Sequence, residues 1–191
     1  DINYEKCVEL TKYHSTYGQG VELKKIHQGK PFCEETLAAF PDDEEIQFAF
    51  ARILKAEKNY NESFKIFDSL RKKNNMEAFR ELSDFHYFGY GDLAQDLQKS
   101  YDYTLKCAEA NLPDCIHDLS HFYNSGKIVE SNFDRGIQLL EKASESGSSQ
   151  ANIELGDAYF YEYYNLEQNI EKSKEYYEIE RSRDNPAAKG A

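Results

Sequence analysis

The amino-acid sequence predicts an all-α superhelix, an α-solenoid built from stacked helix pairs. A small residue followed four positions later by leucine occurs three times, at steps of 37 and 36 residues, and an aromatic residue follows the leucine in two of the copies. Within each copy the apolar residues stand three and four positions apart, which places them on one face of a helix. Because one helix pair cannot bury its own apolar face, successive pairs are expected to stack.

Each of the three copies predicts a helix, a loop and a second helix. The first helices contain Ala78-Phe-Arg-Glu-Leu82-Ser83, Cys115-Ile-His-Asp-Leu119-Ser120 and Ala151-Asn-Ile-Glu-Leu155-Gly156. The small residue after each leucine lets a neighbouring helix approach closely, while the leucine fills the space between helices. The second helices carry recurring small residues of their own, namely Ser100, Gly136 and Ser173.

Upstream of these copies, residues 46–54 and 60–67 predict a shorter helix pair with a tighter turn. Before that pair, residues 31–40 predict the second helix of an incomplete leading unit, starting at Pro31. The Asp42-Asp43 pair is expected to cap the next helix, because a carboxylate there accepts a hydrogen bond from a free N–H of the first turn.

Three residues further along the chain mark expected helix ends. Pro113 stands just inside the start of a helix, where its missing N–H costs little. Gly126 and Gly147 stand where helices should stop, as C-terminal capping residues do. With these boundaries the sequence predicts about nine or ten helices and no sheet.

No linker-like stretch interrupts the chain. We therefore divide it into an N-terminal cap segment over 1–43, a repeat array over 44–183 and a frayed tail over 184–191.

Composition restricts the classes of partner. Lys and Arg together number 23 against 35 Asp and Glu, which gives a formal net charge of −12. Such a balance disfavours nucleic acids and anionic membrane surfaces, both of which need a basic footprint. No apolar run approaches the roughly 18–20 residues of a membrane span. This charge is compatible with a basic or polar protein partner.

Several segments resemble the SEL-like (Sel-one-like) repeats, which are relatives of tetratricopeptide repeats. The segments Leu155-Gly156-Asp-Ala-Tyr159 and Glu141-Lys142-Ala143-Ser144-Glu145-Ser-Gly147 match the family pattern well. With substitutions, Lys106-Cys107-Ala108-Glu109-Ala-Asn111 and Gly89-Tyr-Gly91-Asp-Leu93 match it too. The resemblance extends over residues 44–180, although the loop at residues 162–166 lacks the usual glycines. The spacing of Cys7, Gly20-Val21 and Cys33 resembles the N-terminal cap of exported bacterial members.

The resemblance also implies a pairing for the four cysteines. Cysteine-rich bacterial members join helices through a bridge spaced like Cys107 and Cys115, and Cys7 with Cys33 would tie the N-terminal segment to the first complete helix. Disulfides imply a periplasmic or secreted protein. We expect a signal peptide to have been removed ahead of Asp1, and a chain trimmed at its start is the alternative. The alternative is four unrelated thiols in a reducing compartment.

The sequence carries no recognisable catalytic motif. The sequence has no Gly-x-Ser-x-Gly elbow, no His-Glu-x-x-His pair and no Walker loop, so we expect no catalytic residues and no cofactor. Cys115, His117 and His121 lie on one predicted helix and include an i, i+4 histidine pair. No further ligands are evident and Cys115 is a disulfide candidate, so we expect no metal there.

In tetratricopeptide-like units the first helix of each pair lines a binding groove. Transferred to each repeat here, that arrangement selects twelve partner-binding residues of mixed chemistry: Arg52, Lys55, Arg80, Asp84, Tyr87, Phe88, His117, His121, Asn124, Asp157, Phe160 and Tyr161. Tyr87 and Tyr161 are the expected anchors, because a tyrosine ring gives a large contact area at little entropic cost.

The resemblance implies a non-enzymatic protein-binding module of the bacterial envelope. It would act as an adaptor, or as an immunity protein (an antitoxin) that neutralises a secreted toxin. Two alternatives stay open. Some cysteine-rich relatives have been proposed to act on β-lactams or cell-wall material, and a self-associating structural protein of the envelope would share the same fold.

Overall fold

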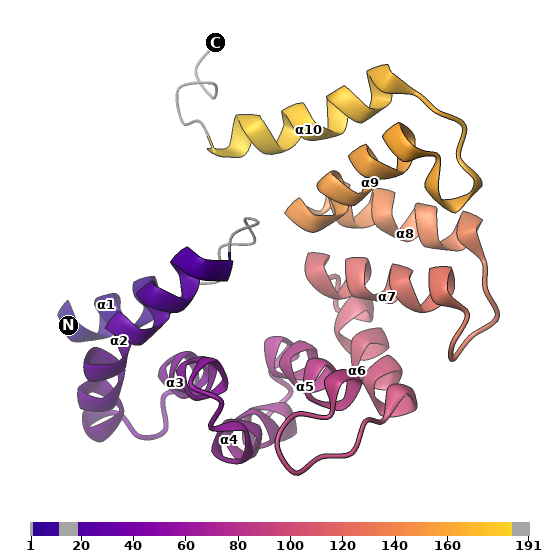
Figure 1. Ribbon diagram of the computed structural model, residues 1–191. Helices are drawn as coiled ribbons and strands as arrows, with labels where there is room; N and C mark the ends of the chain where they lie inside the picture. The colour runs from indigo at the N-terminus through magenta and orange to yellow at the C-terminus, as the bar shows by residue number, and fades with distance from the viewer. Residues whose placement is uncertain (1, 12–18, 185–191) are drawn as a thin grey trace. The chain divides into compact units, whose positions relative to one another are not determined.

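The computed structural model describes residues 2–11 and 19–184, and these ranges form ten α-helices and no strand (Figure 1). The helices are α1 (Ile2–Thr11), α2 (Gln19–Ala39), α3 (Glu44–Ala56), α4 (Tyr60–Lys72), α5 (Met76–Phe88), α6 (Leu97–Glu109), α7 (Pro113–Ser125), α8 (Phe133–Glu145), α9 (Ser149–Tyr161) and α10 (Ile170–Asp184), with a 3-10 turn, η1 (Tyr163–Asn165), after α9. The chain forms two compact units, Asp1–Tyr103 and Thr104–Ala191, whose boundary lies inside α6. Each unit is described by itself.

The first unit begins with a helix hairpin held by a disulfide. Cys7 of α1 and Cys33 of α2 are bonded, with an S–S distance of 2.06 Å, and both are fully buried. Gly29 lets the two helices approach, because a Cβ there would lie 3.2 Å from Leu10 and Thr11 side-chain atoms. Apolar residues of α2 and α3 pack around the disulfide, and the cluster consists of Cys7, Ile26, Cys33, Ile46, Ala49 and Ile53.

The sequence-based start of α2 is wrong. The helix was expected to begin at Pro31, yet it begins at Gln19 and continues through that proline. Proline removes one backbone donor from a helix interior, which normally favours a break. Here Ile26 and Cys33 are buried on either side of it in one cluster, so tertiary packing keeps both halves helical.

The helix pairs of the first unit meet through small residues, as the repeat pattern predicted. The Ser63 hydroxyl of α4 donates a hydrogen bond to the Ala51 carbonyl of α3 over 2.7 Å. In the next pair the Ser83 and Ser100 hydroxyls lie 2.8 Å apart, and Ser83 also donates to the Ser100 carbonyl. The core between these helices consists of Ala51, Phe67, Leu70, Ala78, Leu82 and Phe85.

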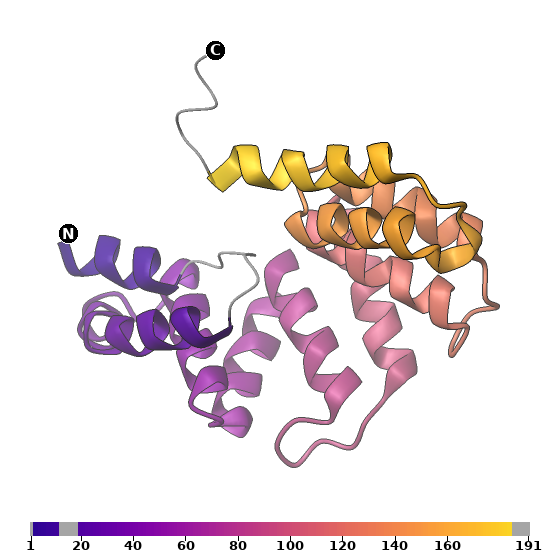
Figure 2. The same cartoon turned by 45° about the horizontal axis from the view of Figure 1, so that its top comes forward.

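In the second unit α7, α8, α9 and α10 follow one another, and each contacts the next (Figure 2). Cys107 and Cys115 form a disulfide across the turn that leads into α7, with an S–S distance of 2.08 Å. The pairing expected for all four cysteines is therefore confirmed. Leu119, Leu140 and Leu155 are at most 5% exposed and fill the space between the helices.

The expected helix ends are also observed. Asp43 caps α3 by accepting a hydrogen bond from the Ile46 N–H over 3.0 Å. Pro113 is the first residue of α7, and Gly126 ends it in the left-handed conformation at φ 65°. After α9 the same left-handed position is occupied by Glu162 at φ 61°, so the turn survives without its glycine.

The expected count of nine or ten helices is confirmed for the described ranges. No helix in those ranges combines the length and the apolar character that crossing a membrane requires. The cap and array boundary at residue 43 stays a prediction. The expected frayed tail, 184–191, lies outside the described residues apart from Asp184, the last residue of α10.

Replacing Gly156 by Ala should lower the free energy of unfolding by on the order of 1 kcal/mol, since overpacking outweighs the better helix propensity of alanine. A Cβ at this position would lie 2.7 Å from the Cε1 atom of the Tyr177 ring. Urea unfolding measures the loss. The Gly156→Ala change made in a Tyr177→Ala background should be neutral or stabilising, and an equal loss in both backgrounds would show that the ring contact is not the cause.

Candidate functional site

All twelve residues predicted to bind a partner lie on α3, α5, α7 and α9, the first helices of their pairs. Six belong to the first unit: Arg52, Lys55, Arg80, Asp84, Tyr87 and Phe88. The other six belong to the second: His117, His121, Asn124, Asp157, Phe160 and Tyr161. The structure thus groups them into two sets, one in each unit.

In the first unit the predicted charges gather around a buried glutamate. The Lys55 ammonium lies 2.6 Å from a Glu81 carboxylate oxygen and 2.9 Å from Asp84, and the Arg52 Nε atom is 3.7 Å from Glu81. Burial raises the pKa of Glu81, but the charges of Lys55, Arg52 and Arg80 outweigh it and hold that pKa below its usual value. Burial likewise lowers the pKa of Lys55, and the two carboxylates outweigh it and raise that pKa.

Sequence reasoning missed Glu81, although a signal for it existed. The residue immediately before the repeat leucine is acidic in all three copies, as Glu81, Asp118 and Glu154. We call these three residues the repeat acids. Glu81 is contacted by Lys55 and Arg52 in the first unit, and Glu154 by His117 and His121 in the second.

Aromatic rings cluster at the C-terminal end of α5. The ring centroids of Tyr87 and Phe88 are 4.9 Å apart, and Phe88 stacks on Tyr90 at 5.3 Å. Tyr90 also stacks on Tyr60 of α4 at 4.8 Å, and the Lys55 ammonium is 5.8 Å from its ring. Phe88 is nevertheless 57% exposed. Sequence reasoning did not assign Tyr60 and Tyr90 to this cluster.

A second aromatic cluster occupies the end of α9. The Phe160 and Tyr161 centroids lie 4.7 Å apart, and Tyr161 stacks on Tyr163 at 5.7 Å. These three rings are 40%, 58% and 50% exposed, respectively. Beside them the Tyr177 hydroxyl of α10 donates a hydrogen bond to Asp157.

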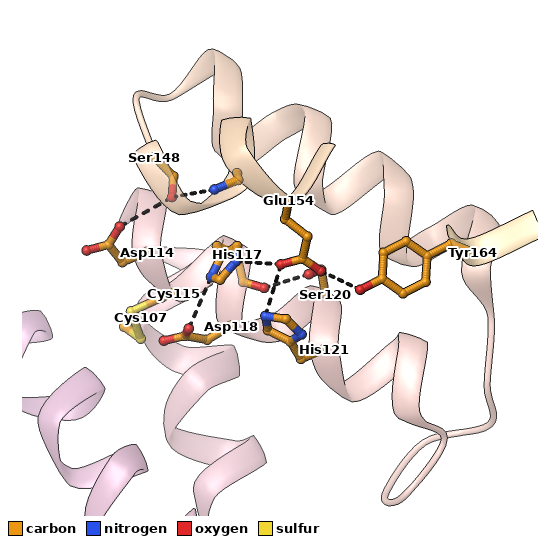
Figure 3. Close-up of polar contacts among 11 residues, drawn as sticks. Cys107, Asp114, Cys115, His117, Asp118, Ser120, His121, Ser148, Glu154 and Tyr164 are labelled. Carbon is orange, nitrogen blue, oxygen red and sulfur yellow. Dashed lines mark hydrogen bonds and ion pairs between the residues drawn. A yellow bond between two sulfur atoms is a disulfide. The ribbon is translucent and has the colours of Figure 1, made fainter. Parts of the chain in front are cut away.

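Two histidines of α7 converge on one carboxylate of α9 (Figure 3). The Nε2 atoms of His117 and His121 lie 2.8 Å and 3.3 Å from the same Glu154 oxygen, Oε2. The two imidazole rings are 4.7 Å apart and nearly perpendicular. Sequence reasoning found the histidine pair but missed Glu154, which lies in the following repeat.

Further side chains orient these groups. Asp118 approaches the Nδ1 atom of His117 at 3.3 Å, and the Tyr164 hydroxyl donates to the other Glu154 oxygen over 2.6 Å. Burial lowers the pKa of His117, but the hydrogen bonds to Asp118 and Glu154 outweigh it and raise that pKa to about 9. For His121 burial dominates, and its pKa is lowered.

Asn124, the remaining predicted residue of α7, faces the paired helix. A Cβ placed on Gly136 of α8 would lie 1.8 Å from its Oδ1 atom, so only glycine leaves room for this amide. Its amide also lies within reach of the Tyr164 hydroxyl of η1, so the contacts of Asn124 extend beyond its own helix pair.

We expect Glu81→Gln to lower the free energy of unfolding by on the order of 3 kcal/mol at neutral pH, because it strips a buried ion pair of its central anion. The pKa of Glu81 is depressed in the folded state. Its stabilising effect is thus fully present above the ordinary glutamate pKa and is lost as pH falls through the depressed value. Denaturation measured from pH 7 down to pH 3 should show the gap between variant and wild type closing, while Glu35→Gln, at an exposed site on α2, should change little at any pH. A gap that persists unchanged at low pH would contradict this account.

Comparisons with known proteins identify the repeat family and the fold. The Sel1 repeat family matches residues 77–112, 113–148 and 149–179. Among solved structures, a Sel1 repeat protein from Oxalobacter formigenes aligns with a TM-score of 0.68 and 20% identity, covering 87% of this chain and 71% of the other. A protective antigen present in uropathogenic Escherichia coli strains, which displays an SLR fold, aligns with a TM-score of 0.61 and 19% identity. That alignment covers 87% of this chain and 35% of the antigen.

A search of curated proteins found no match. The structural likenesses confirm the fold class predicted from the sequence, an all-α superhelix of the SEL-like type. The three repeat matches together cover more than half of the residues, so this chain belongs to the Sel1 repeat family.

Proposed function

We propose that this chain is a non-enzymatic module that binds a specific protein through the exposed faces of its first helices. Proteins with this repeat fold typically act through protein–protein interaction. One observation carries the proposal to particular residues. The same two positions of the repeat, five and six residues after its leucine, hold neighbouring aromatic rings in α5 (Tyr87, Phe88) and again in α9 (Phe160, Tyr161).

The fold buries these rings only in part. Phe88 and Tyr161 are 57% and 58% exposed, whereas the aromatic residues that fill the core, such as Phe67 and Phe85, are fully buried. Apolar rings grouped on a surface favour contact with another protein, and aromatic residues are frequent among the side chains that dominate binding energy. Their recurrence at equivalent positions supports a role beyond the packing of one helix pair.

Charge supports a basic partner. The formal net charge of −12 gives the chain an acidic field that accelerates association with a positively charged protein and slows encounters with acidic ones. The contribution is mainly to the association rate, so raising the ionic strength should slow association more than it speeds dissociation.

Two disulfides support a location in an oxidising compartment, and we propose the bacterial envelope or the extracellular space. There the module would act as an adaptor or as an immunity protein against a secreted basic toxin. The disulfides also take up all four cysteines, so the proposal assigns no role to a thiol nucleophile.

The proposal is tested by comparative capture. The full chain, in its oxidised form, serves as bait for the envelope and secreted fractions of the source organism. Parallel baits carry Phe88→Ala, Tyr161→Ala or both changes. A partner held by these rings should bind the double variant at least about 30-fold more weakly, the effect expected for a residue that dominates binding. Once identified, the partner is titrated directly, and its toxicity with and without this chain tests the immunity role.

The matched control is Phe40→Ala, which removes an aromatic ring that is 49% exposed but lies just after α2, away from the repeat positions. This variant should capture the same protein as wild type. Equal capture by all baits, with melting temperatures unchanged, would place binding on another surface.

The compartment is tested through the cysteines. Non-reducing peptide mapping of protein taken from its native compartment should recover Cys7 with Cys33 and Cys107 with Cys115. Reduction should lower the free energy of unfolding by about 3.5 kcal/mol for the first loop and about 2.5 kcal/mol for the second, in the chain-entropy treatment. Four free thiols in the native protein would contradict both the oxidised state and the proposed location.

A further inference from the structure

We propose that His117, His121 and Glu154 bind one Zn²⁺ ion, with a fourth coordination position open to water or to a ligand atom of another molecule. The proposal stands apart from the proposed partner binding, since it rests on these side chains alone. Each residue offers one ligand atom, and the three atoms lie within 4.8 Å of one another.

The ligand set is one that zinc uses. Two imidazole nitrogens with one glutamate oxygen form a three-ligand shell of the kind that leaves a position free on zinc. In tetrahedral coordination with bonds of about 2.0–2.1 Å, ligand atoms are separated by about 3.3 Å. The Glu154 Oε2 atom already lies 2.8 Å and 3.3 Å from the two Nε2 atoms, so small side-chain rotations bring the three atoms into place. Zinc takes the place of the Nε2 proton of His117, which is released when the ion binds.

Both elements that carry the ligands fix their positions. His117 and His121 are four residues apart on α7, which points their rings to one side of the helix, and α7 contacts α9, which carries Glu154. The Cys115 sulfur is bonded to Cys107 and is therefore excluded as a ligand.

The surroundings resemble the outer shell of a metal site. Metal-binding histidines usually hold their second ring nitrogen against a carboxylate or a carbonyl. Here Asp118 lies 3.3 Å from the Nδ1 atom of His117. The Tyr164 hydroxyl donates a hydrogen bond to Oε1 of Glu154, the carboxylate oxygen that the imidazoles do not contact (Figure 3). Both contacts orient Nε2 and Oε2 toward the shared point.

Access comes from the side of His121. The side chains of His117 and Glu154 are only 11% and 17% exposed, while that of His121 is 50% exposed. An ion reaches the site past His121, and the open position faces the same way. Bound there, zinc would join neighbouring repeats through α7 and α9.

The test uses the untagged full chain with both disulfides intact and ZnCl₂ as the probe, measured by isothermal titration calorimetry. We expect one Zn²⁺ per chain and no binding of Mg²⁺ or Ca²⁺, which prefer shells made only of oxygen. Changes in the outer shell of zinc sites cost about 10–100-fold in affinity. Asp118→Asn should therefore weaken binding about 10-fold, and loss of a ligand in His121→Ala or Glu154→Gln should weaken it more than 100-fold.

Matched controls separate this site from a chance surface histidine. His27→Ala removes a half-exposed histidine whose Nδ1 lies 3.7 Å from Glu57 and which belongs to no cluster of three ligands among the described residues. This variant should bind zinc as wild type does. Circular dichroism verifies that each variant is folded, and His121→Ala is the variant of choice because its side chain is half exposed.

Three results would overturn the proposal. They are the lack of saturable zinc binding by the wild-type chain, equal affinity in His121→Ala and wild type, and equal weakening by His27→Ala and His121→Ala. Co²⁺ in place of zinc tests the open position. Its visible spectrum should change when imidazole is added, and an unchanged spectrum would contradict a free fourth position.

Discussion

The structure depends on close approach between helices that are too short to be stable alone. A helix of thirteen residues, the length of seven of the ten helices that the structure describes, gains most of its stability from packing. Close packing requires small residues where axes meet, and Ser63, Ser83 and Gly156 supply them. The leucine beside each such position can then be buried, and the next residues along the helix are left for other contacts.

Those other contacts differ between the two units although the repeat positions are the same. In the first unit Lys55 and Arg52 neutralise Glu81, and the result is a permanent ion pair in the interior. In the second unit two imidazoles take the place of the fixed cations around Glu154. Imidazole exchanges protons and binds metals near neutral pH, whereas ammonium and guanidinium groups do neither. The same repeat position thus holds an acid paired with fixed cations in one unit and an acid paired with titratable imidazoles in the other.

Much of the fold could be predicted from the sequence because its signals are local and repeated. The helix caps at Asp43 and Gly126 depend only on neighbouring residues, so the local sequence is enough to predict them. The start of α2 could not be found in this way, because packing of Ile26 and Cys33 overrides the effect of Pro31. The histidine pair was visible within one helix, but Glu154 joins it from the next repeat, and only the stacking of α7 and α9 brings the three together. The partner-binding role of the twelve predicted residues stays a prediction.

Both disulfides join cysteines that are near each other along the chain, 26 and 8 residues apart. Each bond therefore closes within one helix hairpin or one turn, and its formation does not have to wait for distant segments to meet. During synthesis both Cys7 and Cys33 are present before most of the repeats have been made. Cys107 and Cys115 are both present as soon as the start of α7 has been made. A chain of this kind can be oxidised step by step from its N-terminus, with little opportunity for a cysteine to choose the wrong partner.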